Sequence, residues 1–211
     1  MNEKYIYIVV SHTATKFGKL LRIFGKIEYN HSAIALDEHF DEIYAFARPQ
    51  YRAMILARFV KESYTSYTLN TDEPIPIKVY RIPLSEDAYN YVKDTLYHVH
   101  DDKDIHYNIF SVFTFPILNG CRVHKTYTCS EFVTHVLKDI GISMPLPCYR
   151  YKPEDLVHLL KDYFYYEGDI RDILSPSNID ENFFDPPTWE LRKECMRVLH
   201  KISIRSLNFK K

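Results

Sequence analysis

A single stretch of sequence decides the fold: Thr128-Cys129-Ser130-Glu131-Phe132-Val133-Thr134-His135-Val136-Leu137. Thr128 and Glu131 form a capping box, in which the side chain of each residue bonds the backbone N–H group of the other. This pairing makes Thr128 the N-cap and Cys129 the first residue of a helix that we predict over residues 128–140. The apolar stripe that docks this helix on a core consists of Phe132, Val133, Val136, Leu137 and Ile140.

Cys129 has the setting of a nucleophilic cysteine. At a helix N-terminus a thiol faces free backbone N–H groups and the positive end of the helix dipole, and both lower its pKa. The alternative, that Cys129 is only a small buried hydrophobic residue, stays open on position alone. The other cysteines, Cys121, Cys148 and Cys195, lack this setting. The irregular spacing of all four argues against a disulfide scaffold or a zinc knuckle.

A nucleophilic cysteine needs a base, which is most often a histidine. Of the ten histidines, His135 lies on the same helix but about 240° around it from Cys129, so its imidazole cannot face the thiol. His31 begins a predicted strand, on which Ala33 and Ala35 share its face. We expect this small-residue face to admit the start of the Cys129 helix. A strand-end histidine that is only hydrogen-bonded at the sheet margin fits the same pattern.

The rest of the chain predicts a sheet surrounded by helices. Strands are expected at residues 5–10, 31–36, 43–47, 66–69, 75–82 and 163–166, with an acidic turn joining the second and third into a hairpin. Helices are expected at 15–24, from Ser85 onward and at 153–160. A polar loop is expected at 98–106 and a buried apolar segment at 107–117. Together these elements predict one α+β domain, an antiparallel sheet with the Cys129 helix packed across it.

The composition excludes several classes of protein. The chain has 211 residues, of which 46% are hydrophobic and 26% are charged, as in ordinary globular proteins and unlike disordered chains. Its net charge of -1 argues against nucleic acid as a partner, because binding a polyanion needs a surplus of basic charge. No run is long and apolar enough for a transmembrane helix, and we find no signal peptide. We therefore expect a cytoplasmic protein without integral membrane association.

The charge pattern changes after residue 166, where we place the end of the main domain, 1–166. Residues 167–190 carry seven acidic residues and one Arg, whereas residues 191–211 carry seven basic residues and one Glu. We expect this C-terminal extension, 167–211, to pack on the same domain, with its two halves paired with each other or solvated. The sharper alternative is a basic tail that contacts an anionic membrane or partner.

Two motifs resemble a known superfamily. The run Cys129-Ser130-x-Phe132-Val133 resembles the nucleophile motif of NlpC-type peptidases, which are papain-like. The histidine here precedes the cysteine, an order similar to that of the circularly permuted branch, which includes YiiX-type bacterial proteins and the lecithin:retinol acyltransferase group. The run Tyr29-Asn30-His31-Ser32-Ala33-Ile34-Ala35-Leu36 resembles the histidine strand of that branch, and the likeness covers roughly residues 5–160. It implies a permuted papain-like fold with Cys129 and His31 as the catalytic pair.

The resemblance also implies a third polar residue, on the strand after the histidine strand, that orients the imidazole. Pairing the predicted hairpin places Phe46 or Arg48 across from His31. Neither suits this role, because Phe46 is apolar and Arg48 disfavours a protonated imidazole. Asp41 and Glu42 are acidic but lie too near the turn. The orienting group is therefore a backbone carbonyl, a residue elsewhere in the chain, or missing.

The function implied by the resemblance is that of a cysteine hydrolase or acyltransferase. It would act on an amide or ester bond of a peptide, a cell-wall peptide or a lipid, without a cofactor or a metal ion. The Cys129 thiolate attacks the carbonyl, His31 transfers the proton, and the Cys129 backbone N–H donates to the oxyanion. Tyr127 lines the pocket or donates its hydroxyl there, unless it is simply a buried aromatic residue.

Two other functions stay open at this point. A catalytically weak papain-like module that binds a lipid or a peptide is favoured by the lack of a third polar residue. A metal-dependent hydrolase would use His98, His100 and Asp101 or Asp102, which lie close together in the sequence. The sequence leaves the substrate and the oligomeric state undetermined.

Overall fold

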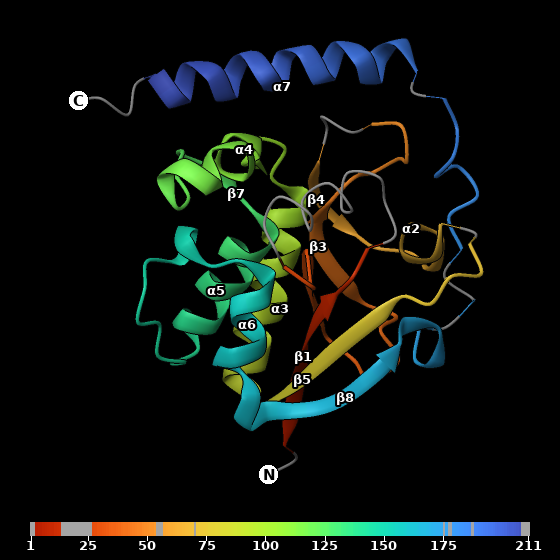
Figure 1. Ribbon diagram of the computed structural model, residues 1–211, viewed down its shortest axis with the longest axis vertical. Helices are drawn as coiled ribbons and strands as arrows, with labels where there is room; N and C mark the ends of the chain where they lie inside the picture. Colours follow the sequence, from red (N-terminus) through yellow and green to blue (C-terminus); the bar gives the residue numbers. More distant parts are fainter. Residues whose placement is uncertain are drawn as a thin grey trace.

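A six-stranded antiparallel sheet forms the centre of the computed structural model, with helices packed against it (Figure 1). The structure describes residues 3–13, 27–53, 57–69, 71–174, 176, 179–186 and 188–207. The strand order is β4-β3-β2-β1-β5-β8. The strands are β1 (Lys4–Ser11), β2 (His31–Ala35), β3 (Ile43–Ala47), β4 (Arg58–Lys61), β5 (Pro76–Leu84) and β8 (Phe164–Asp169). This architecture confirms the predicted α+β class and its antiparallel sheet.

The helices lie around this sheet. The α-helices of the described residues are α2 (Tyr64–Thr68), α3 (Glu86–Asp101), α4 (Ile109–Leu118), α5 (Cys129–Asp139), α6 (Pro153–Leu159) and α7 (Trp189–Leu207). Three short 3₁₀ turns are η1 (Cys148–Arg150), η2 (Lys161–Tyr163) and η3 (Ile170–Asp172). Two short strands, β6 (His106–Tyr107) and β7 (Thr126–Tyr127), form a separate parallel pair. The helix expected at 15–24 falls outside the described residues.

The local sequence signals of α5 act as predicted. The Thr128 hydroxyl accepts a hydrogen bond from the Glu131 N–H at 3.1 Å, and the Glu131 carboxylate accepts one from the Thr128 N–H at 3.2 Å. This confirms the capping box and makes Cys129 the first residue of the helix. The helix ends before Gly141, whose φ of 94° is the left-handed conformation that favours glycine.

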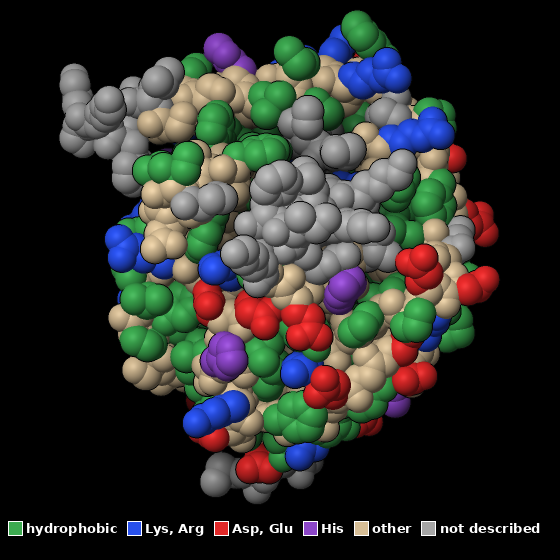
Figure 2. Space-filling model, viewed as in Figure 1, with side chains coloured by type: hydrophobic (Ala, Val, Ile, Leu, Met, Phe, Trp, Pro, Cys, Tyr) green, Lys and Arg blue, Asp and Glu red, His purple; other side chains and the backbone are tan. Residues whose placement is uncertain are grey.

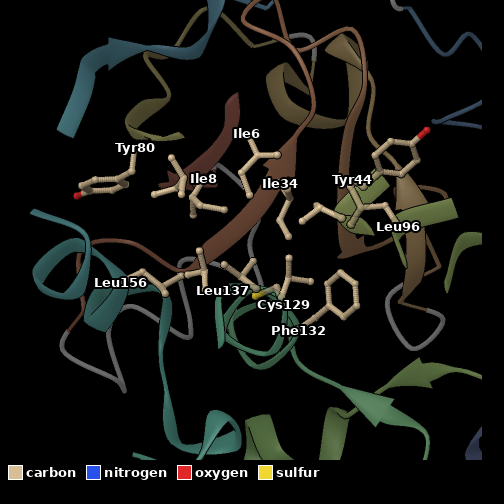
Figure 3. Packing of buried hydrophobic residues seen from close by; sticks show 14 of the residues in the cluster. Ile6, Ile8, Ile34, Tyr44, Tyr80, Leu96, Cys129, Phe132, Leu137 and Leu156 are labelled. Carbon is tan, nitrogen blue, oxygen red and sulfur yellow. The ribbon is translucent and has the colours of Figure 1, made fainter. Parts of the chain in front are cut away.

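The apolar stripe of α5 packs on the sheet through large residues (Figure 3). Phe132, Val133 and Leu137 share one core with Ile34 and with the residues of β1 that point the same way. The prediction that the helix would pack on the small-residue face of β2 is therefore wrong. Large aliphatic side chains interdigitate with a helix stripe and bury more apolar area there, about 25 cal/mol for each Å².

The small-residue face of β2 has a different cover. Ala33 and Ala35 lie in a second core, with Tyr67 from α2 and Ile170 from η3. Small residues allow an aromatic ring to approach the sheet closely. The sheet is thus buried on both faces, and His31 stands at the end of a fully buried strand.

Three local predictions need correction. Residues 66–69 were expected to form a strand, but Ser63 and Ser66 form a capping box, and residues 64–68 are helical. The expected loop at 98–106 begins as helix, because α3 continues to Asp101. The expected buried segment at 107–117 is mostly helix α4, on which Phe113 and Ile117 are exposed.

The C-terminal extension adds a strand to the sheet and a helix that packs on the domain. Strand β8 runs across the boundary placed at residue 166 and pairs with β5. Helix α7 docks through Val198 and Ile202, which are buried in a small third core. Its basic side chains Lys201 and Arg205 bond Asp104, which lies outside the acidic segment 167–190. Lys193 lies 3.5 Å from Glu190, which belongs to that segment. In the described part of the chain, no helix has both the length and the apolarity that crossing a bilayer needs.

Candidate active site

His31 and Glu62 form a buried pair at the end of the sheet. The imidazole Nε2 lies 2.9 Å from a carboxylate oxygen of Glu62, and the two side chains are only 10% and 5% exposed. His31 is the first residue of β2 and pairs with Ser11 of β1. Glu62 directly follows β4 and precedes Ser63, the N-cap of α2. A charged acceptor in a buried site holds an imidazole in one orientation more firmly than a neutral one does.

Cys129 is the second group that interacts with this imidazole. The cysteine is 7% exposed at the start of α5, and Cys129 and His31 shift each other's pKa. Because Nε2 of His31 bonds Glu62, Nδ1 is the ring nitrogen left to interact with the thiol. The structure thus brings together Cys129 and His31, as predicted, although α5 packs on the opposite face of β2. Because His31 is the first residue of β2, its ring lies at the margin of the sheet and can interact with groups on either face.

The electrostatics of this pair favour separated charges. Burial lowers the pKa of His31, but the Glu62 carboxylate and the Cys129 sulfur raise it more, so that the pKa lies at about 10. Burial raises the pKa of Cys129, but His31 and Ser32 outweigh it, and the pKa lies below the ordinary value for a thiol. A raised pKa on the base and a lowered pKa on the thiol together favour a thiolate–imidazolium pair near neutral pH.

Ser32 is a second group beside the sulfur that sequence reasoning missed. It is fully buried, and by the alternation of β2 it points toward α5 together with Ile34. Its backbone N–H and its hydroxyl lower the pKa of the Cys129 thiol. The sequence signal was the polar residue in an otherwise apolar strand, next to the candidate histidine.

Two tyrosines near the sulfur were also missed. Burial raises the pKa of Tyr67 and Tyr107 well above the ordinary value, and the charge of Cys129 raises both further, after that of Glu62 in the case of Tyr67. The tyrosine proposed from the sequence, Tyr127, has its ring in an aromatic cluster instead. Its ring centroid lies 5.9 Å from that of Phe46 and 5.8 Å from that of Phe132.

The polar side chain that contacts His31 is Glu62, and it does not come from β3. The residue pairing of β2 and β3, extended from Ile34–Tyr44 and Ala35–Ile43, puts Ala47 rather than Phe46 or Arg48 level with His31. Glu42, near the turn, accepts a hydrogen bond from the Tyr97 hydroxyl at 2.9 Å and is engaged there. Asp41 is exposed.

Glu62 directly follows the edge strand β4, and its carboxylate lies 2.9 Å from Nε2 of His31. The only sequence signal for Glu62 is its position between an edge strand and a helix N-cap. The burial of its side chain cannot be seen in the sequence.

The other histidines named in the sequence analysis lie on α5 and α3. His135 lies on α5 with its ring 5.5 Å from that of Tyr127, as its rotation around the helix requires. His98 and His100 belong to the last turn of α3, and Asp102 is its C-cap. Within the described ranges, no group of three His, Cys, Asp or Glu side chains is arranged to hold a metal ion.

Glu131 gives a test of the electrostatics around α5. The residue is 1% exposed, and burial raises its pKa to about 7, against the lowering effects of the Thr128 N–H and Arg122. The folded chain then holds this proton more tightly than the unfolded chain, so the contribution of Glu131 to stability falls as the pH rises through about 7. Glu131→Gln keeps the capping acceptor and removes the charge.

We expect Glu131→Gln to raise the free energy of unfolding at pH 8 by on the order of 2 kcal/mol, and at pH 5 by less than about 1 kcal/mol. Urea denaturation at the two pH values measures both changes. Glu38→Gln, at an exposed carboxylate, is the matched control and should change neither value. An equal gain for Glu131→Gln at both pH values would contradict the buried charge.

Comparisons of the chain with protein-family models, with curated proteins and with solved structures gave no significant match.

Proposed function

We propose that this chain is a cysteine-dependent hydrolase or acyltransferase that acts on an amide or ester bond, on a permuted papain-like fold. One observation carries the proposal: Cys129, His31 and Glu62 come from three separate segments and are buried together, with Glu62 2.9 Å from His31 and with His31 and Cys129 shifting each other's pKa. Burying three ionisable groups together is unfavourable for stability, and such groups are concentrated at functional sites.

The reaction follows from the charges of the pair. The Cys129 thiolate adds to the carbonyl carbon, and the electron pair of the C=O bond moves onto oxygen. His31 gives its Nδ1 proton to the leaving amine or alcohol as the tetrahedral intermediate collapses to a thioester. Water, or an acceptor alcohol or amine, then loses a proton to His31 and attacks the thioester, which restores the thiolate–imidazolium pair. Glu62 keeps the imidazole oriented throughout.

The start of α5 supplies the oxyanion donor. Cys129 is the first residue of the helix, where the backbone N–H has no intrahelical partner. That N–H and the positive end of the helix dipole face charge that develops next to the sulfur. The charge of Cys129 also acts on the hydroxyls of Tyr67 and Tyr107.

The order of the histidine strand and the cysteine helix along the chain supports the proposal of a permuted papain-like fold. A histidine at the start of one sheet strand, followed in the chain by a nucleophile-bearing helix on that sheet, is the arrangement of the permuted papain-like branch. The alternative of an inactive binding module was favoured by a missing third residue, and Glu62 occupies that place. The preferred substrate is a small peptide or a lipid, because the groups around the sulfur are largely aromatic and aliphatic.

Labelling with iodoacetamide across a pH series, followed by peptide mapping, tests the proposal. We expect Cys129 to be modified at pH 6 while Cys148 and Cys195 are not, because burial raises the pKa of both of those thiols. Cys129→Ala should abolish labelling by a thiol-directed acyl probe at pH 7. Unchanged probe labelling of Cys129→Ala, or equal pH profiles for the three cysteines, would overturn the proposal.

A further inference from the structure

Large apolar side chains are exposed mainly at one end of the molecule. Eleven such side chains are exposed among the described residues, and six of them lie on α4 and α7. They are Phe113, Ile117 and Leu118 on α4, and Trp189, Met196 and Ile204 on α7. The two helices are neighbours in Figure 1, and Phe110 of α4 packs in the core that holds α7. Single exposed apolar residues are common, but this concentration points to a surface that contacts something else.

Helix α7 has two different faces. Val198 and Ile202 are buried against the domain, and the Arg205 guanidinium donates to Asp104 at 2.8 Å. The opposite face carries Trp189 and Met196, which are 67% and 68% exposed, and Ile204. With 100° of rotation for each residue, these three positions fall within about 80° of one another. The outer face therefore has its own apolar stripe along a helix of about 28 Å.

Basic side chains flank this outer stripe. Arg192, Lys193 and Arg197 are exposed and lie within a turn of Trp189 or Met196. The Lys193 ammonium also lies 5.4 Å from the centre of the Trp189 ring. Figure 2 shows hydrophobic side chains beside Lys and Arg side chains along the upper edge of the molecule, where α7 lies. The segment that contains α4 adds no negative charge of its own, since the sequence has no Asp or Glu from Ile105 to Ser130.

We propose that α7, with α4 beside it, forms an interfacial surface that binds the anionic face of a lipid bilayer. Apolar side chains in the acyl boundary and flanking Lys and Arg at the head groups are the contacts that hold such helices to membranes. The surface is a protruding helix rather than a groove, which suits a planar partner (Figure 1). A surplus of exposed basic over acidic side chains on α7 complements anionic lipid.

The single tryptophan of the chain reports this binding directly. We expect the Trp189 emission of the full chain to shift to shorter wavelength with phosphatidylglycerol-containing vesicles and to stay unchanged with pure phosphatidylcholine vesicles. Met196→Asp/Ile204→Asp should weaken vesicle binding by at least about tenfold. Arg192→Gln/Arg197→Gln should weaken it by about 30-fold at low ionic strength.

Phe164→Asp is the matched control, because Phe164 is 55% exposed on β8, at the opposite end of the molecule in Figure 1. It should leave vesicle binding unchanged, and circular dichroism checks that each variant is folded. Equal shifts with both kinds of vesicle, or binding that survives both double variants, would overturn the proposal. So would a Trp189 shift that depends on protein concentration without vesicles, which would assign the surface to a second copy of the chain.

Discussion

His31→Asn should lower the rate at which iodoacetamide modifies Cys129 at pH 6 by at least about tenfold. Burial raises the pKa of the thiol, and His31 is the largest influence that opposes it. Without the imidazole, the pKa should return to at least the free value of about 8.5, which leaves about 0.3% of the thiolate at pH 6. Mass spectrometry of the Cys129 peptide, followed over time from pH 5 to pH 9, measures the rate.

His135→Asn is the matched control for this experiment. It removes an imidazole from α5 itself, but that imidazole packs against Tyr127 rather than the sulfur. Its alkylation profile should follow that of the unaltered chain. A His31→Asn rate within threefold of the unaltered rate at pH 6 would show that the end of α5 lowers the thiol pKa without help from His31.

The features that could be predicted from the sequence are local. Thr128 and Glu131 are three residues apart, so their capping box, the start of α5 and the position of Cys129 follow from the sequence alone. The strand at His31 is predicted in the same way from a short stretch, residues 31–36. Both are determined by neighbours within one turn or one strand, and the family resemblance then joined them into a candidate pair.

The features that could not be predicted depend on distant segments. Glu62 reaches His31 only because β4 folds back along β3, 31 residues later in the chain. Which face of β2 receives α5 depends on what else covers the sheet, and Tyr67 and Ile170 cover the alanine face. A periodic apolar pattern shows that two faces differ but not which partner each one meets.

The exposed side chains of α4 are a second feature that the sequence alone does not predict. The segment from Ile109 to Leu118 contains no charged residue, and its apolar composition predicts burial. Its first turn is indeed packed, since Phe110 contacts the core under α7, but Phe113 and Ile117 are exposed. An apolar composition does not show how many sides of a helix the rest of the chain will cover.

Glu62→Gln should raise the pH midpoint of Cys129 alkylation by at least about one unit, and so slow the reaction at pH 6 about tenfold. Burial alone lowers the pKa of His31, and the Glu62 carboxylate is the largest influence that raises it. With a neutral amide in its place, the imidazole loses its proton at a lower pH, and the thiolate loses its counter-ion. Glu62→Asp keeps the charge on a shorter side chain and should shift the midpoint less.

Glu42→Gln is the control at a carboxylate that bonds Tyr97 instead, and it should leave the midpoint unchanged. A double-mutant cycle separates orientation of the imidazole from a general effect on the fold. If Glu62 acts through His31, then Glu62→Gln should have no further effect on alkylation in the His31→Asn chain, because the group that it orients is already gone. An equal slowing in both backgrounds would mean that Glu62 supports the end of β4 and the start of α2 rather than the chemistry of Cys129.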